Sequence, residues 1–159
     1  HQGSLSNGVI ETTTNFVKSI IDESPLNHYT MCVFTGRGLA FYYLYDTAVL
    51  ANPSTIVKHT EMYSNVFDAF EHVLRFVPSV EIDRCVKDTS RVCRIPGTIN
   101  TKVNQYAKCL EYYPTHQYAP CELYSFFTEE VFGVTKFEKR VDTSALLAEL
   151  DASFEFEEK

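Results

Sequence analysis

The sequence lacks several features that would assign a protein to a class at once. No apolar run approaches the ~20 residues that a membrane-spanning helix needs. The sequence also lacks the charged start and following apolar stretch of a secretory signal. The five cysteines are irregularly spaced and include no CxxC pair, which argues against a disulfide framework and favours reduced thiols. We therefore expect a cytoplasmic protein that does not enter a membrane.

An excess of positive charge is also missing. The formal net charge is −7, whereas a nucleic-acid backbone attracts lysine and arginine. The charges are unevenly spread: seven acidic and three basic residues follow from Glu138 onward, but six basic and two acidic residues lie between Asp83 and Lys108. Because salt screens charges beyond about 10 Å, a ligand responds mainly to the local charge. The charge alone neither supports nor excludes a nucleic-acid partner.

The composition predicts one packed domain. With 159 residues, 45% hydrophobic and 14% aromatic, the chain is long enough to bury a substantial core but short for two domains. The first four residues, HQGS, resemble a tag or protease-site remnant. We expect the domain over residues 5–136, followed by an acidic tail or peripheral helix over residues 137–159.

The hydrophobic periodicity predicts a mixture of strands and helices. The expected strands are 8–13, 29–34, 39–45 and 101–112, the expected helices are 14–23, 53–77 and 121–132, and short elements are expected at 82–86 and 91–95. The spacing is that of hairpins rather than of regular βαβ units. It favours an α+β fold with a mainly antiparallel sheet and helices packed on one face.

Two segments contain residue types that bind phosphate. Thr35-Gly36-Arg37-Gly38 has two glycines, which let backbone amides approach a phosphate closely, and an arginine that donates to it. Asp83 is followed by a basic stretch with Arg91, Arg94 and Lys102, which suits a divalent metal ion beside a triphosphate. From composition alone, an ordinary hairpin turn and a surface ion pair beside a Pro-Gly turn are the preferred explanations of the two segments.

Both segments resemble motifs of the archaeo-eukaryotic primase superfamily. Residues Asp88 to Lys102, DTSRVCRIPGTINTK, resemble the signature D-x-x-R-V-x-R-x-P-G-T-x-N-x-K. Residues Thr35 to Tyr43, TGRGLAFYY, resemble the second motif, S-G-x-G-x-H-x-Y. The two blocks occur in the family's order with a helix between them, so the resemblance covers about residues 9–108. It implies the primase-polymerase domain of a replication protein from a plasmid, phage or integrated mobile element.

The resemblance implies both a fold and a chemistry. The fold is an α/β unit beside an RRM-like unit, and the chemistry is templated nucleotidyl transfer with Mg²⁺ or Mn²⁺ ions held by carboxylates. The implied partners are a single-stranded DNA template, nucleoside triphosphates, and a helicase domain or replication partner. Asp83 matches the catalytic and metal-binding carboxylate of the third motif. The implied nucleotide-binding residues are Thr35, Gly36, Arg37, Gly38, Arg91, Arg94, Asn100 and Lys102.

The chain departs from the family pattern in two places. Ala40 stands where the family commonly has a histidine that contacts the triphosphate. The first motif, D-x-D or D-x-E on a strand, has no clear counterpart; the best candidate is Glu11, which shares a face with Thr13 on the strand expected over 8–13. Glu11 is therefore the second candidate catalytic and metal residue.

These departures leave alternatives open. Either the first motif lies upstream of the sequence, or the site is degenerate and the domain binds nucleic acid or a replication partner without polymerase activity. A third alternative is an unrelated α+β interaction module in which both motifs are structural turns.

The cysteines and one histidine offer a candidate zinc site. Cys109, His116 and Cys121, with Cys85 or Cys93, are the candidate ligands. Their spacings of seven and five residues fit no common zinc knuckle, so we expect no zinc.

Overall fold

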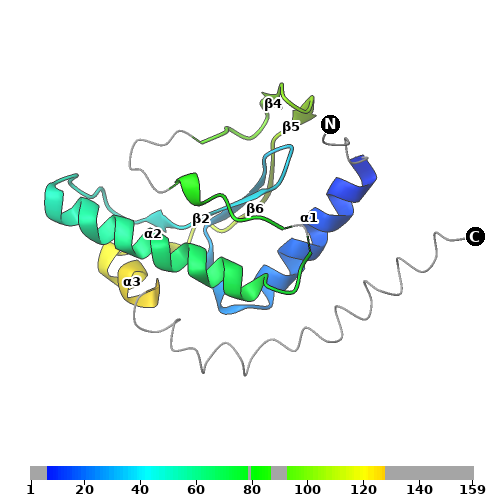
Figure 1. Cartoon of the computed structure of the whole chain (residues 1–159). Coiled ribbons are helices and arrows are strands. Elements are labelled where there is room, and N and C mark those ends of the chain that lie inside the picture. Colours follow the sequence, from blue (N-terminus) through cyan, green and yellow to red (C-terminus); the bar gives the residue numbers. More distant parts are fainter. Residues whose placement is uncertain (1–6, 79, 87–92, 128–159) are drawn as a thin grey trace, which may run out of the picture.

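The computed structural model describes residues 7–78, 80–86 and 93–127 (Figure 1). The helices are α1 (Asn7–Asp22), α2 (Pro53–Val73) and α3 (Pro120–Ser125), with short 3₁₀ helices η1 (Pro25–His28) and η2 (Arg84–Val86). The strands are β1 (Met31–Phe34), β2 (Leu39–Tyr42), β3 (Leu44–Tyr45), β4 (Ile99–Asn100), β5 (Gln105–Tyr106), β6 (Lys108–Tyr112) and β7 (Gln117–Tyr118).

The central sheet has three antiparallel strands in the order β2-β1-β6. The β1–β2 hairpin pairs Phe34 with Leu39, and β1 pairs with β6 through an irregularity between Cys32 and Val33. Two smaller sheets join β3 to β7 in parallel and β4 to β5 antiparallel. This arrangement confirms the predicted α+β class with mainly antiparallel pairing.

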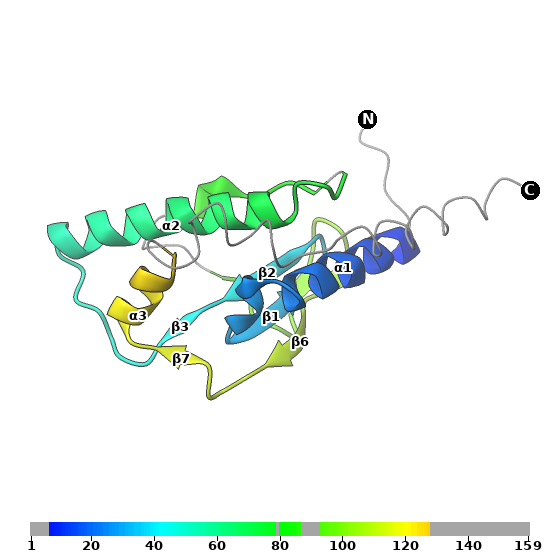
Figure 2. The same ribbon diagram turned by 90° about the horizontal axis from the view of Figure 1, so that it is seen from below.

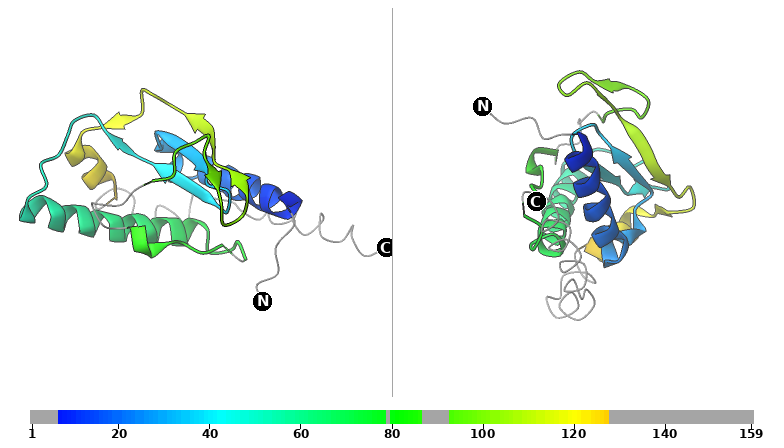
Figure 3. Two further views of the ribbon diagram at one scale, coloured as in Figure 1. Left: turned by 90° about the horizontal axis from the view of Figure 1, so that it is seen from above. Right: turned by 90° about the vertical axis from the view of Figure 1, so that its right-hand side faces the viewer.

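One hydrophobic core joins the helices to the central sheet, and Figures 2 and 3 show α1 and α2 running along the same side of that sheet. The buried cluster comprises Val17, Ile20, Ile21, Leu26, Tyr29, Cys32, Met62, Ala69, Phe70, Val73, Leu74, Val77, Leu123 and Phe127. The ring of Phe41 on β2 lies 5.1 Å from that of Tyr29 and 5.5 Å from that of Phe70 on α2. Burying a large apolar side chain contributes about 1.5–3 kcal/mol, so this cluster is the main source of stability.

The N-terminal helix differs from the prediction. A strand over 8–13 and a helix from residue 14 were expected, but α1 begins at Asn7 and includes both segments. The buried positions Thr14, Val17 and Ile21 recur at helical spacing, and the hydroxyl of Thr12 donates to the carbonyl of Gly8. Packing of this stripe outweighs the strand preference of the β-branched residues, so the prediction of a strand is wrong.

The long helix was predicted well at its start and less well at its end. The side chain of Asn52 accepts hydrogen bonds from the amides of Ser54 and Thr55, which caps α2. The helix ends at Val73, short of the expected residue 77, because a tight turn follows before Pro78. None of the helices in the described ranges combines the length and apolar character of a membrane-spanning segment.

The other predicted elements are shorter than expected. The strand over 39–45 is divided into β2 and β3, and the strand over 101–112 begins with a turn at residues 101–104 and continues as β5 and β6. The element over 82–86 is η2 alone, and residues 93–95 have no regular structure. In the helix expected over 121–132, α3 ends at Ser125, and residues 128–132 lie outside the described ranges, as do residues 91–92 and the tail over 137–159.

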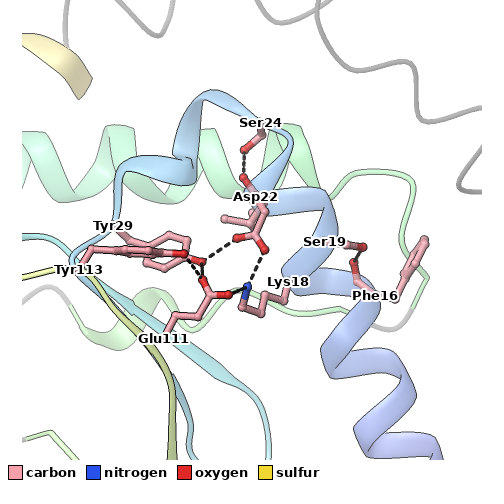
Figure 4. Close-up of polar contacts among 9 residues, drawn as sticks. Phe16, Lys18, Ser19, Asp22, Ser24, Tyr29, Glu111 and Tyr113 are labelled. Atoms are coloured by element: carbon pink, nitrogen blue, oxygen red, sulfur yellow. Dashed lines mark hydrogen bonds and ion pairs between the residues drawn. The ribbon is translucent and has the colours of Figure 1, made fainter. Parts of the chain in front are cut away.

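A polar network at the edge of the core ties α1 to the sheet (Figure 4). The ammonium of Lys18 lies 2.5 Å from Asp22 Oδ2 and 2.7 Å from Glu111 Oε1. The hydroxyl of Tyr29 lies 2.6 Å from both carboxylates, and that of Tyr113 donates to Glu111 at 2.8 Å. Burial alone would raise the pKa of Glu111, but the hydrogen bonds from Lys18 and the two tyrosines outweigh it and lower that pKa.

We expect Lys18→Met to lower the free energy of unfolding by about 1–3 kcal/mol, because Asp22 and Glu111 would face each other without their shared cation. Urea denaturation measures this change. Lys58→Met is the matched control: Lys58 is exposed on α2 and takes part in no ion pair with the described residues, so its loss should be below about 0.5 kcal/mol. Equal losses in the two variants would contradict the role given to the network.

The network also predicts a pH dependence. Since the folded-state pKa of Glu111 lies below its ordinary value of 4.5, its stabilisation is present above pH 4.5 and is lost as the pH falls through the folded-state pKa. We therefore expect urea midpoints to fall below pH 4.5 more steeply in the unmodified protein than in Glu111→Gln. Identical pH slopes in the two proteins would refute this assignment.

Candidate phosphate-binding site

The two sequence blocks that resemble primase motifs meet in the structure. The side-chain amide of Asn100 donates to the carbonyl of Thr35 at 2.9 Å, although the two residues are 65 positions apart in the sequence. Asn100 is only 5% exposed. At Gly36, a Cβ atom would lie 3.0 Å from the Cβ of Asn100 and 3.1 Å from that of Gln105. The Thr35–Gly38 turn therefore packs directly against the β4–β5 hairpin, as Figure 1 shows at the upper end of the sheet.

Local hydrogen bonds hold each side of this contact. The amide and hydroxyl of Thr35 both donate to the carbonyl of Gly38, at 2.9 and 3.1 Å, and close the turn. On the other side, the amide of Gly97 donates to the carbonyl of Ala107 at 2.8 Å. Asn100 Oδ1 accepts from the amide of Lys102 at 3.2 Å. The side-chain oxygen of Asn100 thus forms a hydrogen bond within its own hairpin, and its side-chain nitrogen forms one to the Thr35–Gly38 turn.

The segment that begins at Cys93 and leads into the β4–β5 hairpin also contacts strand β2. Burial and then a hydrogen bond with Cys93 raise the pKa of Tyr42 to about 12. Ala40 lies on the same sheet face as Tyr42 because alternate residues of a strand share a face, whereas Phe41 points into the core. Ala40, at the position of the family's histidine, therefore lies on the sheet face that contacts the segment containing Arg94 and Asn100.

Four cations lie in the segments that make the contact between the blocks, and we call them the basic surface: Arg37, Arg94, Lys102 and Lys108. Arg37 lies within the turn, and Lys108 pairs with Phe34 in the sheet, one residue before Thr35. Arg94 Nη1 donates to the carbonyl of Ile99 at 3.3 Å. Residues 34–45 and 93–108 contain these four cations and no acidic residue, which gives a local charge of +4.

The cations of the basic surface remain open to a ligand. All four residues are exposed. Within the described ranges, the ion pairs involve Lys18 and Arg84 and none of these four. The remaining predicted nucleotide-binding residue, Arg91, lies outside those ranges.

The two candidate carboxylates are not brought together. Glu11 is exposed on α1, and the first turns of α1 and helix η2 lie well apart in Figures 1 and 2. Asp83 is exposed just before η2, where its Oδ1 accepts the amide of Cys85 at 3.0 Å. The neighbouring Arg84 turns towards α2 and pairs with Asp68 at 2.7 Å and Glu71 at 2.5 Å.

The Mg²⁺ or Mn²⁺ ions that the resemblance implies stay a prediction. In the described ranges, no three His, Cys, Asp or Glu side chains gather where they could hold a metal ion. The zinc candidates are also separately engaged: Cys109 Sγ donates to the carbonyl of Glu111, and His116 Nδ1 lies 3.2 Å from the carbonyl of Tyr29. All five cysteines are free; Cys32 is buried and the other four are exposed.

Sequence reasoning missed three residues of the site. Gln105 packs against Gly36, Lys108 completes the basic surface, and Tyr106 is 56% exposed between Lys102 and Lys108. The signal that could have found them is the absence of any acidic residue from 93 to 108.

Comparisons with known proteins add no assignment. The sequence matches no protein-family model, no curated protein and no solved structure.

The contact between the blocks can be tested with two glycines. Gly36 and Gly97 both have φ near +89°, so alanine should cost about 1–2 kcal/mol at either position through its backbone alone. Only Gly36 has neighbours within 4 Å of an added Cβ, and we expect Gly36→Ala to lose a further ~1–3 kcal/mol in urea denaturation. Equal losses would show that the turn and the hairpin do not pack closely.

Proposed function

We propose that this chain binds the phosphates of nucleotides and single-stranded nucleic acid, as part of a primase-polymerase-like replication protein in the cytoplasm of its host cell. The observation that carries the proposal is the Asn100–Thr35 contact within the basic surface. It joins the two blocks of residues that resemble the primase motifs into one site. The resemblance itself supplies the replication context.

The charge arrangement supports phosphate as the ligand. Phosphate oxygens accept from arginine and lysine, and the four cations lie in two segments that contain no acid, so their local field outweighs the overall charge of −7 at short range. The two glycines that flank Arg37 have no side chains of their own, which lets a phosphate approach the backbone of the turn. The chain can therefore attract a polyanion locally although its total charge repels one.

Exposed apolar side chains beside the cations favour a nucleic acid over free phosphate. Tyr106 on β5 is 56% exposed and its strand partner Ile99 on β4 is 43% exposed. Bases stack on exposed aromatic rings while the backbone follows adjacent cations. The site therefore suits a single strand, whose bases are available for stacking.

Templated nucleotidyl transfer is the second candidate function. It is favoured by Asp83, which is exposed, forms no ion pair with the described residues and uses only Oδ1, towards the Cys85 amide, in the hydrogen bonds of those residues. The binding function is preferred because Glu11 lies on α1 away from η2 and because Ala40 cannot donate a hydrogen bond from its side chain.

The binding proposal predicts a loss of affinity and of salt dependence. We expect Arg94→Ala and Lys102→Ala each to weaken binding of an oligothymidine of about 15 nucleotides several-fold and to lower the salt slope by roughly 0.7–1. Fluorescence anisotropy over a salt series measures both quantities. Lys58→Ala on α2 is the control and should change neither. If the oligonucleotide does not bind, or if all three variants bind equally, the basic surface is not the binding site.

Template-directed synthesis separates the two candidates. The assay supplies single-stranded DNA, labelled nucleotides and Mg²⁺ or Mn²⁺ to the unmodified chain and to Asp83→Ala. Binding without product in the unmodified chain is the expected result for a binding domain. Product that disappears in Asp83→Ala would instead establish nucleotidyl transfer and make Glu11 the next residue to test.

A further inference from the structure

We propose that the acidic segment of residues 138–159 binds the basic surface within the same molecule and competes there with nucleic acid. The competition rests on the proposed function; the intramolecular contact does not. Residues 138–159 lie outside the described ranges, and their role is inferred from charge, length and the place where the described chain ends.

The charges of the two segments are complementary. Residues 138–159 carry seven acidic and three basic residues, a net −4, and residues 34–45 with 93–108 carry +4. The acidic segment holds seven of the 21 acidic residues of the chain. In the described ranges, four acids are already compensated by an ion pair with Lys18 or Arg84: Asp22, Glu111, Asp68 and Glu71. The acidic segment is a candidate counter-charge for the basic surface because it gathers seven acids within 22 residues.

The length of the chain permits the contact. The described chain ends at Phe127, which is 1% exposed and packs its ring 5.3 Å from that of Tyr43. From Phe127 to Glu149 there are 22 residues, which span at most roughly 70 Å. A domain of this size has a radius of gyration of about 13 Å, so any point on its surface is within reach.

Attachment to the same chain makes a weak contact effective. A short tether gives an effective concentration in the millimolar range, so even an attraction of a few charges holds the acidic segment on the surface for part of the time. A nucleic acid must then displace it. Because both contacts are electrostatic, salt weakens the intramolecular one as well.

The test compares two full-length variants of equal charge. The tail variant carries Glu155→Gln, Glu157→Gln and Glu158→Gln. The control variant carries Glu23→Gln, Asp46→Asn and Glu81→Gln, which are exposed positions without an ion pair in the described ranges. We expect the tail variant to bind the oligothymidine at least about threefold more tightly than the control at low salt, and the difference to vanish near ~0.5 M salt.

A measurement without nucleic acid tests the contact directly. The backbone amide signals of Arg37, Asn100 and Lys102 in NMR spectra should shift between the unmodified chain and the tail variant, and stay unchanged in the control variant. Shifts without any oligonucleotide binding would support the intramolecular contact and refute the proposed function. Equal affinities together with unchanged amide signals would overturn this inference while leaving the proposed function in place.

Discussion

The candidate site depends on one buried side chain amide. Asn100 donates from its nitrogen to the Thr35 carbonyl and accepts at its oxygen from the Lys102 amide, so the turn and the hairpin each satisfy part of its hydrogen-bonding capacity. A buried amide without these partners would cost about 1–3 kcal/mol, which makes separation of the two segments unfavourable. The positions of Arg37 and Lys102 relative to each other follow from this contact, since each lies within two residues of a bonded group.

Charge is used in two different ways in this fold. Lys18 is 14% exposed and lies between two carboxylates, and Arg84 pairs with two acids on α2, so these cations hold elements together. The cations of the basic surface lie in segments without acids and are left to solvent. Lys18 and Arg84 pair with acids that the fold brings beside them, whereas the cations of the basic surface form no ion pair with the described residues and remain available to a ligand.

Much of the fold, but less of the site, could be predicted from the sequence. Strong local signals succeeded: the apolar run of β1, the glycine turn after it and the Asn52-capped helix α2 are all encoded by neighbouring residues. The strand predicted around Glu11 failed because the burial of Val17 and Ile21 depends on packing against segments distant in sequence. That change moves Glu11 onto a helix, and no local pattern could have placed it relative to Asp83. The contact between Thr35 and Asn100 joins segments 65 positions apart, which periodicity alone could not predict.

The hairpin region is fastened at several points, to β2 through Cys93, within itself through Gly97 and Ala107, and to the turn through Asn100. Its backbone is therefore already ordered before any ligand arrives. Ordering one backbone residue costs about 1–2 kcal/mol of conformational entropy, and a preorganised surface does not incur that loss on binding. A phosphate chain meeting this surface would lose mainly its own freedom, so changes in the ligand's flexibility should govern affinity more than changes in the protein's.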